Sequence, residues 1–144
     1  MKKLAFWLLA AGVSLPVMAI EFRTVEEAAI LYDTPSQKGV KLFVIKRSTP
    51  VEVVVSLENL VKVRDADGGL AWIEKKNLSN RRSLIVIAGR AEVRQSADAV
   101  AHLVFEAEKG VLLDYLETAA GGWIKVRHRD GQSGFVRASQ VWGI

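Results

Sequence analysis

The sequence contains no cysteine among its 144 residues. This absence excludes a disulfide framework, a catalytic thiol and a lipid-modified cysteine, so an acylated lipoprotein is not expected. Only two histidines are present, His102 and His128. A metal site needs three or four ligands at suitable spacing, so we expect no metal. The sequence also has no His-x-x-x-His pair, no Gly-x-Ser-x-Gly motif and no phosphate loop, and we therefore expect no cofactor and no catalytic residues.

The chain lacks a strong excess of either charge. It carries 20 basic and 16 acidic residues, and after Ala19 the numbers are 18 and 16. A nucleic-acid-binding domain of this size is expected to be strongly basic. The balance therefore predicts that nucleic acid is not a partner.

One stretch lacks charge altogether. Residues 4–18 are uncharged and follow the basic start Met1-Lys2-Lys3, and Ala19 ends the stretch with a small residue. This pattern predicts a secretory signal peptide over residues 1–19, cleaved after Ala19. A membrane anchor is the alternative, but the run is shorter than the ~20 residues that span a bilayer, and Pro16 interrupts it. We therefore expect a periplasmic or secreted protein with no membrane span after cleavage.

What the sequence does contain is a repeat. Residues 62–73 read KVRDADGGLAWI and residues 125–136 read KVRHRDGQSGFV, 63 positions further on. Each copy predicts two short strands joined by an Asp-Gly turn, which accounts for Asp67 and Asp130 without a catalytic role. The spacing suits one small β-barrel per copy. A barrel of about 60 residues is near the lower size limit for folding, so we expect the two copies to support each other.

Further apolar and β-branched runs predict the remaining strands of each copy. They cover residues 28–32, 40–45, 51–55, 60–64 and 70–73 in the first copy, and 84–87, 91–94, 102–105, 110–116, 123–127 and 133–136 in the second. Residues 76–78 resemble a closing one-turn helix, and residues 24–29 are the one helical candidate near the start. The predicted domains are 20–80 and 84–144, joined by a short polar linker at 79–83.

These motifs resemble those of the bacterial SH3-like (SH3b) domains. In the second copy the resemblance lies in Gly122–Val136, in Lys109-Gly110 and in Glu92-Val93-Arg94; in the first it lies in Val61–Arg64, Asp67-Gly68 and Ala71-Trp72-Ile73. The pair resembles exported tandem SH3-like proteins. The fold implied is all-β, with two tandem small SH3-like β-barrels after the signal peptide. The resemblance implies a recognition role, often for peptidoglycan or peptides.

Two departures from the family pattern fall where such domains often bind ligand. Tyr32 stands where the family usually has Arg, and Ala97-Asp98 stands where it usually has Gly-Pro. Exposed aromatic rings beside a loop can form a groove for a peptide or a glycan. Tyr32 and Trp123 are the predicted ligand contacts, with Trp123 half exposed beside Gly121-Gly122. The alternative for both is packing in a core or between the domains.

The sequence therefore predicts a non-catalytic recognition module of the periplasm or cell envelope. It would bind peptide or peptidoglycan, and a second domain would raise the effective concentration of the first. The alternative is a structural adaptor in a periplasmic protein complex. A cell-wall hydrolase is disfavoured by the missing nucleophile and metal ligands. Basic residues 75–76 and 81–82 are interpreted as solvated rather than as contacts for an anionic polymer.

Overall fold

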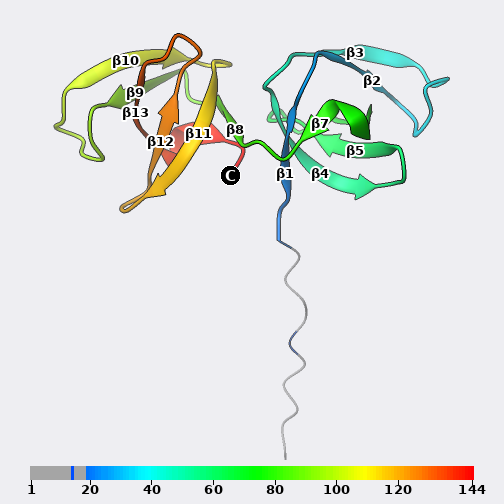
Figure 1. Cartoon of the computed structure of the whole chain (residues 1–144), viewed down its shortest axis with the longest axis horizontal. Coiled ribbons are helices and arrows are strands. Elements are labelled where there is room, and N and C mark those ends of the chain that lie inside the picture. Colours follow the sequence, from blue (N-terminus) through cyan, green and yellow to red (C-terminus); the bar gives the residue numbers. More distant parts are fainter. Residues whose placement is uncertain (1–13, 15–18) are drawn as a thin grey trace, which may run out of the picture.

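The computed structural model describes residue 14 and residues 19–144, so most of the predicted signal peptide lies outside the described residues. The described strands form two antiparallel sheets, one per predicted domain (Figure 1). The first contains β1 (Phe22–Val25), β2 (Ala29–Tyr32), β3 (Lys41–Ile45), β4 (Pro50–Ser56), β5 (Leu60–Arg64), β6 (Leu70–Glu74) and β7 (Leu78–Ser79). The second contains β8 (Ser83–Val86), β9 (Arg90–Arg94), β10 (Leu103–Glu108), β11 (Leu112–Ala119), β12 (Trp123–Arg127), β13 (Ser133–Arg137) and β14 (Val141–Trp142).

The two sheets have the same topology. The first runs β3-β2-β6-β5-β4-β1-β7, and adding seven to each number gives the order of the second, β10-β9-β13-β12-β11-β8-β14. A one-turn 3-10 helix precedes the last strand of each sheet, at Lys75–Asn77 and Ala138–Gln140. The expectation of an all-β tandem of two equivalent domains is confirmed.

The two repeated hairpins occupy the same place in each domain. Lys62 pairs with Trp72 across β5 and β6, and Lys125 pairs with Phe135 across β12 and β13. The turns contain Gly68 and Gly131, whose φ angles of 88° and 94° lie in the left-handed region that favours glycine. This is the reason for the repeated Asp-Gly dipeptide.

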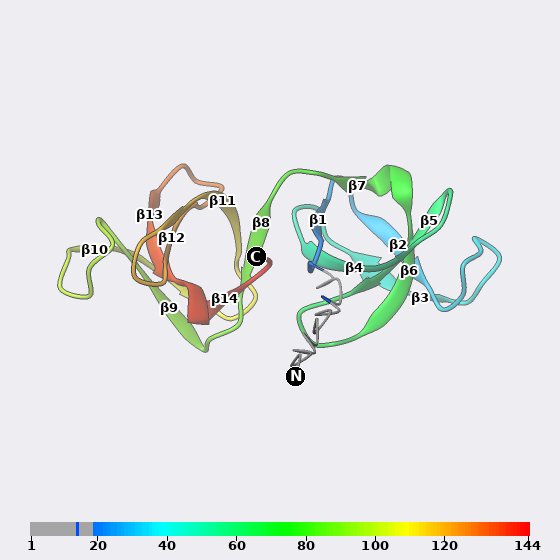
Figure 2. The same ribbon diagram turned by 90° about the horizontal axis from the view of Figure 1, so that it is seen from below.

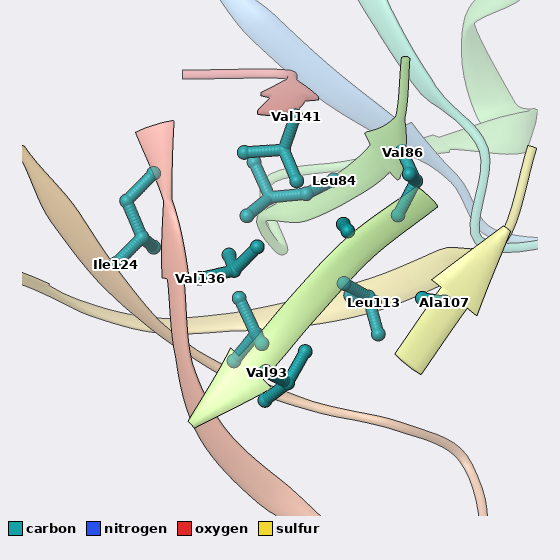
Figure 3. Packing of buried hydrophobic residues seen from close by; sticks show 10 residues of the cluster. Leu84, Val86, Val93, Ala107, Leu113, Ile124, Val136 and Val141 are labelled. Carbon is teal, nitrogen blue, oxygen red and sulfur yellow. The ribbon is translucent and has the colours of Figure 1, made fainter. Parts of the chain in front are cut away.

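Each sheet curls around its own apolar core. The first core gathers the buried side chains of Val25, Ala29, Leu31, Ile45, Val51, Val61, Val63, Ala71 and Ile73. The second gathers those of Leu84, Val86, Ala91, Val93, Ala107, Leu113, Ile124, Val126, Val136 and Val141, and Figure 3 shows how they point inward from different strands. Most come from alternating positions of a strand, so one face of each sheet is buried.

The helical alternative for residues 24–29 is wrong. Phe22–Val25 is strand β1, paired with β4 on one side and β7 on the other. The polar Thr24 tolerates burial there because its hydroxyl group finds two partners. It donates to the carbonyl of Arg81 at 2.5 Å and shares a 2.9 Å hydrogen bond with the hydroxyl of Ser83. Tertiary pairing therefore overrides the local helix signal.

The predicted polar linker is shorter than expected. β7 ends at Ser79 and β8 begins at Ser83, which is buried, so only three residues connect the domains. The domains sit side by side in both views (Figures 1 and 2), and β1 lies next to β8 and the C-terminal end. The rings of Phe22 and Trp142 meet edge to face across this contact, with centroids 5.0 Å apart.

The two connector arginines contact protein groups and are not simply solvated. The Arg81 guanidinium donates to the hydroxyl of Ser48 at 3.1 Å. The Arg82 guanidinium lies 5.2 Å from the centroid of the Tyr115 ring and donates to the Gly143 carbonyl at 3.4 Å. Arg81 therefore attaches the connector to the first domain, and Arg82 attaches it to the second.

Among the described residues, no helix has the length and apolar character that a bilayer crossing requires.

Candidate functional site

Tyr32, the first predicted ligand contact, ends strand β2 and pairs with Trp72 of β6. Only 6% of its surface is exposed. The loop that follows is closed by two hydrogen bonds: the Val40 amide donates to the Asp33 carboxylate at 2.8 Å, and the Asp33 amide donates to the Val40 carbonyl at 3.1 Å. Tyr32 is therefore buried directly before this loop, and its role in ligand binding stays a prediction.

Trp123, the second predicted contact, begins strand β12 and is also 6% exposed. Its place after two glycines predicts half exposure. It is buried instead because Arg137, directly opposite on β13, places its guanidinium 4.4 Å from the ring centroid. Tyr32 and Trp123 belong to different sheets, one in each domain.

The most exposed apolar surface of the first domain lies elsewhere, on strand β3. Leu42, Phe43 and Val44 are 45%, 50% and 63% exposed, and Leu70 at the start of β6 is 46% exposed. We call these four residues the β3 surface. β3 is the terminal strand of its sheet, so the backbone groups along its outer edge have no partner strand among the described residues. An exposed apolar edge of this kind is a template for an added strand.

A small opening leads from the β3 surface into the core. Phe43 and Leu70 line a cavity of about 30 Å³, whose floor includes the buried side chain of Leu31. The cavity lies next to the β5–β6 turn, where the Asp65 carboxylate accepts hydrogen bonds from the amides of Asp67 and Gly69. This turn folds back on itself and leaves the Phe43 ring uncovered.

The equivalent surface of the second domain is covered and charged. Phe105 of the second domain is equivalent to Phe43, and His128 is equivalent to Asp65. The ring centroids of Phe105 and His128 are 5.8 Å apart. Glu106 takes the place of Val44 and forms a salt bridge of 3.6 Å with Arg90. Strand β10 still exposes Leu103 and Val104, and Leu103 lies opposite Arg94. The β3 surface is therefore a property of the first domain.

The sequence contains a signal for the β3 surface that the predicted ligand contacts leave unused. Residues 42–45 are four consecutive apolar residues, while a half-buried strand alternates. In a small sheet with one core, only alternate side chains can be buried. An apolar run on an edge strand therefore leaves apolar side chains in water.

The titratable groups near the hairpin of the second domain have a structural role. The Gln132 backbone amide donates to Asp130, which lowers the pKa of that carboxyl below its ordinary value, and His128 and Arg129 act in the same direction. The other histidine, His102, is exposed in the loop before β10. Within the described part of the chain, no group of three or more His, Cys, Asp or Glu residues could hold a metal ion.

Several solved structures share the arrangement weakly. NlpC2 from Trichomonas vaginalis has 10% sequence identity and a TM-score of 0.41, over 90% of this chain and 50% of its own. NlpC1 from the same organism has 10% identity and a TM-score of 0.41, over 96% and 51%. An NlpC/P60 family protein from Bacillus cereus has 14% identity and a TM-score of 0.38, over 85% and 56%. The chain thus spans about half the length of these proteins, and at this similarity they carry no argument about its activity.

No curated protein matches the chain. The family model described as bacterial SH3 domain, however, matches it twice, over residues 25–80 and 88–143. The first match takes in strands β2 to β7 and the second takes in strands β9 to β14, and together they include more than half of the sequence. The chain therefore belongs to the bacterial SH3 domain family and contains two copies of that domain.

Proposed function

We propose that this protein is a non-catalytic recognition module of the cell envelope that binds peptide or peptidoglycan through its SH3-like domains. Bacterial SH3 domains are cell-wall-binding modules and are generally non-catalytic, which supports the class of function. The observation that carries the proposal is the β3 surface, an apolar patch on an edge strand of the first domain. The proposal includes domains at 20–80 and 84–144 and export to the periplasm or beyond after cleavage at Ala19.

The β3 surface suits an extended peptide. Such a peptide can add to the outer edge of β3 through main-chain hydrogen bonds, while its alternate side chains contact Leu42, Val44 and Phe43. The opening beside Phe43 and Leu70 would receive one small apolar side chain. Tyr32 and Trp123 can reach a ligand only through their small exposed edges, so the proposal depends on the β3 surface rather than on them.

Cosedimentation of the protein with purified peptidoglycan tests the proposal. We expect the protein to pellet with the wall material at low salt, and we expect Val44→Glu to reduce pelleting about tenfold because it places a charge in the apolar patch. Val104→Glu is the matched control, since it makes the same change on the equivalent strand of the second domain. Absence of pelleting, or an equal loss with both variants, would overturn the wall-binding proposal.

A structural adaptor is the second candidate, because an unpaired edge strand accepts a strand of a folded protein as readily as a free peptide. Pull-down from periplasmic extract separates the two. One partner that is retained by the protein, lost with Val44→Glu and recovered without wall material would favour the adaptor. A zymogram addresses the hydrolase alternative: clearing of wall substrate by the purified protein would contradict a non-catalytic role.

A further inference from the structure

A second surface, separate from the β3 surface, lies between the two domains. It is a cleft of about 650 Å³. One wall is the loop between β3 and β4 together with Arg81 of the connector; the other is the start of β11 and the end of the β12–β13 hairpin. Because the walls come from different domains, the cleft exists only in the tandem.

The cleft concentrates the positive charge of the molecule. Its walls contain five Lys and Arg side chains and one carboxylate, that of Asp114; the cations are Lys46, Arg47, Arg81, Arg127 and Arg129. The local excess is four positive charges, while residues 20–144 as a whole have 18 basic and 16 acidic side chains. The rest of the molecule is therefore slightly acidic, and the positive potential is localised between the domains.

Little inside the cleft neutralises these cations. Arg127 lies 3.7 Å from the Asp114 carboxylate. Lys46, Arg47, Arg81 and Arg129 form no salt bridge with any described carboxylate. Like charges gathered in one concave region repel each other, and an anion from solution relieves that repulsion.

The wall that carries Arg81 is held in place by an unusual residue. Ser48 has a φ of 67°, the one positive φ among the described residues other than glycine. The equivalent turn in the second domain contains Gly110, with φ of 90°, and both residues line the cleft. The amide of each donates to β1 or β8 in the same way, Ser48 to Val25 and Gly110 to Val86. What serine adds in this strained conformation is its hydroxyl group, which accepts the hydrogen bond from Arg81.

We propose that this cleft is a binding site for an oligoanion that carries several phosphate or carboxylate groups. Guanidinium groups recognise both oxyanions through paired hydrogen bonds, and four of the five cations are arginines. A ligand with a single charge meets one wall, whereas an oligoanion meets both domains at once. The Ser48–Arg81 hydrogen bond orders one guanidinium before the ligand arrives, which reduces the entropy lost on binding.

Titration calorimetry with inorganic tripolyphosphate and with a tetraglutamate peptide tests the site at about 50 mM and about 300 mM salt. We expect at least one probe to bind at low salt and to weaken at high salt. The double variant Arg47→Ala/Arg129→Ala removes one cation from each wall and is expected to weaken binding at least about tenfold. Tighter binding of tripolyphosphate would assign the site to phosphate groups, and tighter binding of tetraglutamate would assign it to carboxylates.

The matched control is Lys38→Ala/Arg90→Ala, which removes the same charge from exposed positions outside the cleft. Retained binding in the control supports the site. Equal weakening in both double variants, or no binding of either probe to the unchanged protein, would overturn it. Ser48→Gly gives a third test: it allows the backbone geometry that Gly110 shows and removes the side chain with its hydroxyl, so binding should fall severalfold while the melting temperature is retained. This titration contains no wall material, so its failure is distinguishable from that of the proposed function.

Discussion

The two domains have the same strand order and equivalent hairpins, yet their edge strands differ. In the first domain the outer face of the β2–β3 pair carries Ile30 opposite Val44; in the second, the same places are taken by Glu92 opposite Glu106, each beside an arginine. Residues that close the core are apolar in both copies, because each core has to exclude water. The exposed positions are free to differ, and the difference marks the surface that distinguishes the first domain.

The turns of the two domains also differ in the side chains that they present to solvent. Asp65 in the first domain ties its own turn together, while His128 in the second packs on Phe105. Ser48 replaces the equivalent Gly110 despite the unfavourable backbone angle. Each replacement changes what is presented to solvent and leaves the strand order untouched. Substitutions made in one domain at a time test whether the two copies are equivalent in stability.

The largest effect is expected from opening a cavity in one core. Ile73 and Ile124 are buried in the first and second core. Ile73→Ala and Ile124→Ala should each lower the free energy of unfolding by about 2–5 kcal/mol, from lost burial and the cavity left behind. Urea unfolding followed by tryptophan fluorescence and by circular dichroism measures the loss. We expect each substitution to destabilise only its own domain. If either one destabilised both domains equally, the two domains would unfold as one cooperative unit, although their cores are separate.

The next effect concerns the contact between the domains. Thr24→Val keeps the shape of the side chain but leaves the Ser83 hydroxyl and the Arg81 carbonyl without the Thr24 hydroxyl. Buried polar groups that lose a partner cost about 1–3 kcal/mol, so thermal unfolding should begin at a lower temperature. Thr118→Val is the control, since Thr118 is exposed and bonds only with the Tyr115 hydroxyl. A similar loss in both variants would contradict a special role for the interdomain hydroxyl pair.

A smaller and equal effect is expected at the two repeated turns. Gly68 and Gly131 have open space where the methyl group of an alanine would lie, so Ala at either place meets no clash and is penalised only by its positive φ. Gly68→Ala and Gly131→Ala should each cost about 1 kcal/mol, measured by chemical denaturation. Costs that differ by more than the experimental error would show that the turns are not equivalent in energy.

The smallest effect is a dependence on pH at the second hairpin. The amide of Gln132 lowers the pKa of Asp130, so the charged carboxylate stabilises the folded state. That contribution is complete above the pKa of the unfolded chain, and it is lost as the pH falls through the lower folded value. Asp130→Asn should therefore lower the melting temperature slightly at about pH 7, and this difference should shrink as the pH falls below the ordinary pKa of an aspartate. A constant difference across this range would exclude the titration as its origin.

The repeat made the fold predictable. Alternation in Val61–Arg64 and the Asp-Gly turns specify the β5–β6 hairpin locally, and the same residues recur in the second copy. Strand β1 was missed because Thr24-Val25-Glu26-Glu27 reads locally as a helix start. Its pairing with β4 and β7 is a tertiary effect that no window of the sequence contains.

The binding surfaces were less predictable. A tryptophan after two glycines gives no information on its exposure, because the covering Arg137 is 14 positions away and reaches Trp123 only through the β12–β13 pairing. The cleft joins residues 46–48 to residues 110–129, a proximity set by the packing of one domain on the other. Only the β3 surface had a local signal, the unbroken apolar run at its edge.

The connector has a consequence for any ligand that meets both domains. Ser79 and Ser83 are four residue steps apart, so their Cα atoms can be separated by at most about 14 Å, and the domains stay near each other even if their contact opens. The connector therefore limits the distance between the two domains, and they cannot bind independently at widely separated places on one ligand. A repetitive polymer would bind both domains at once only where the spacing of its units matches the distance between them. Selectivity for ligand length would then follow without any change in the binding chemistry of either domain.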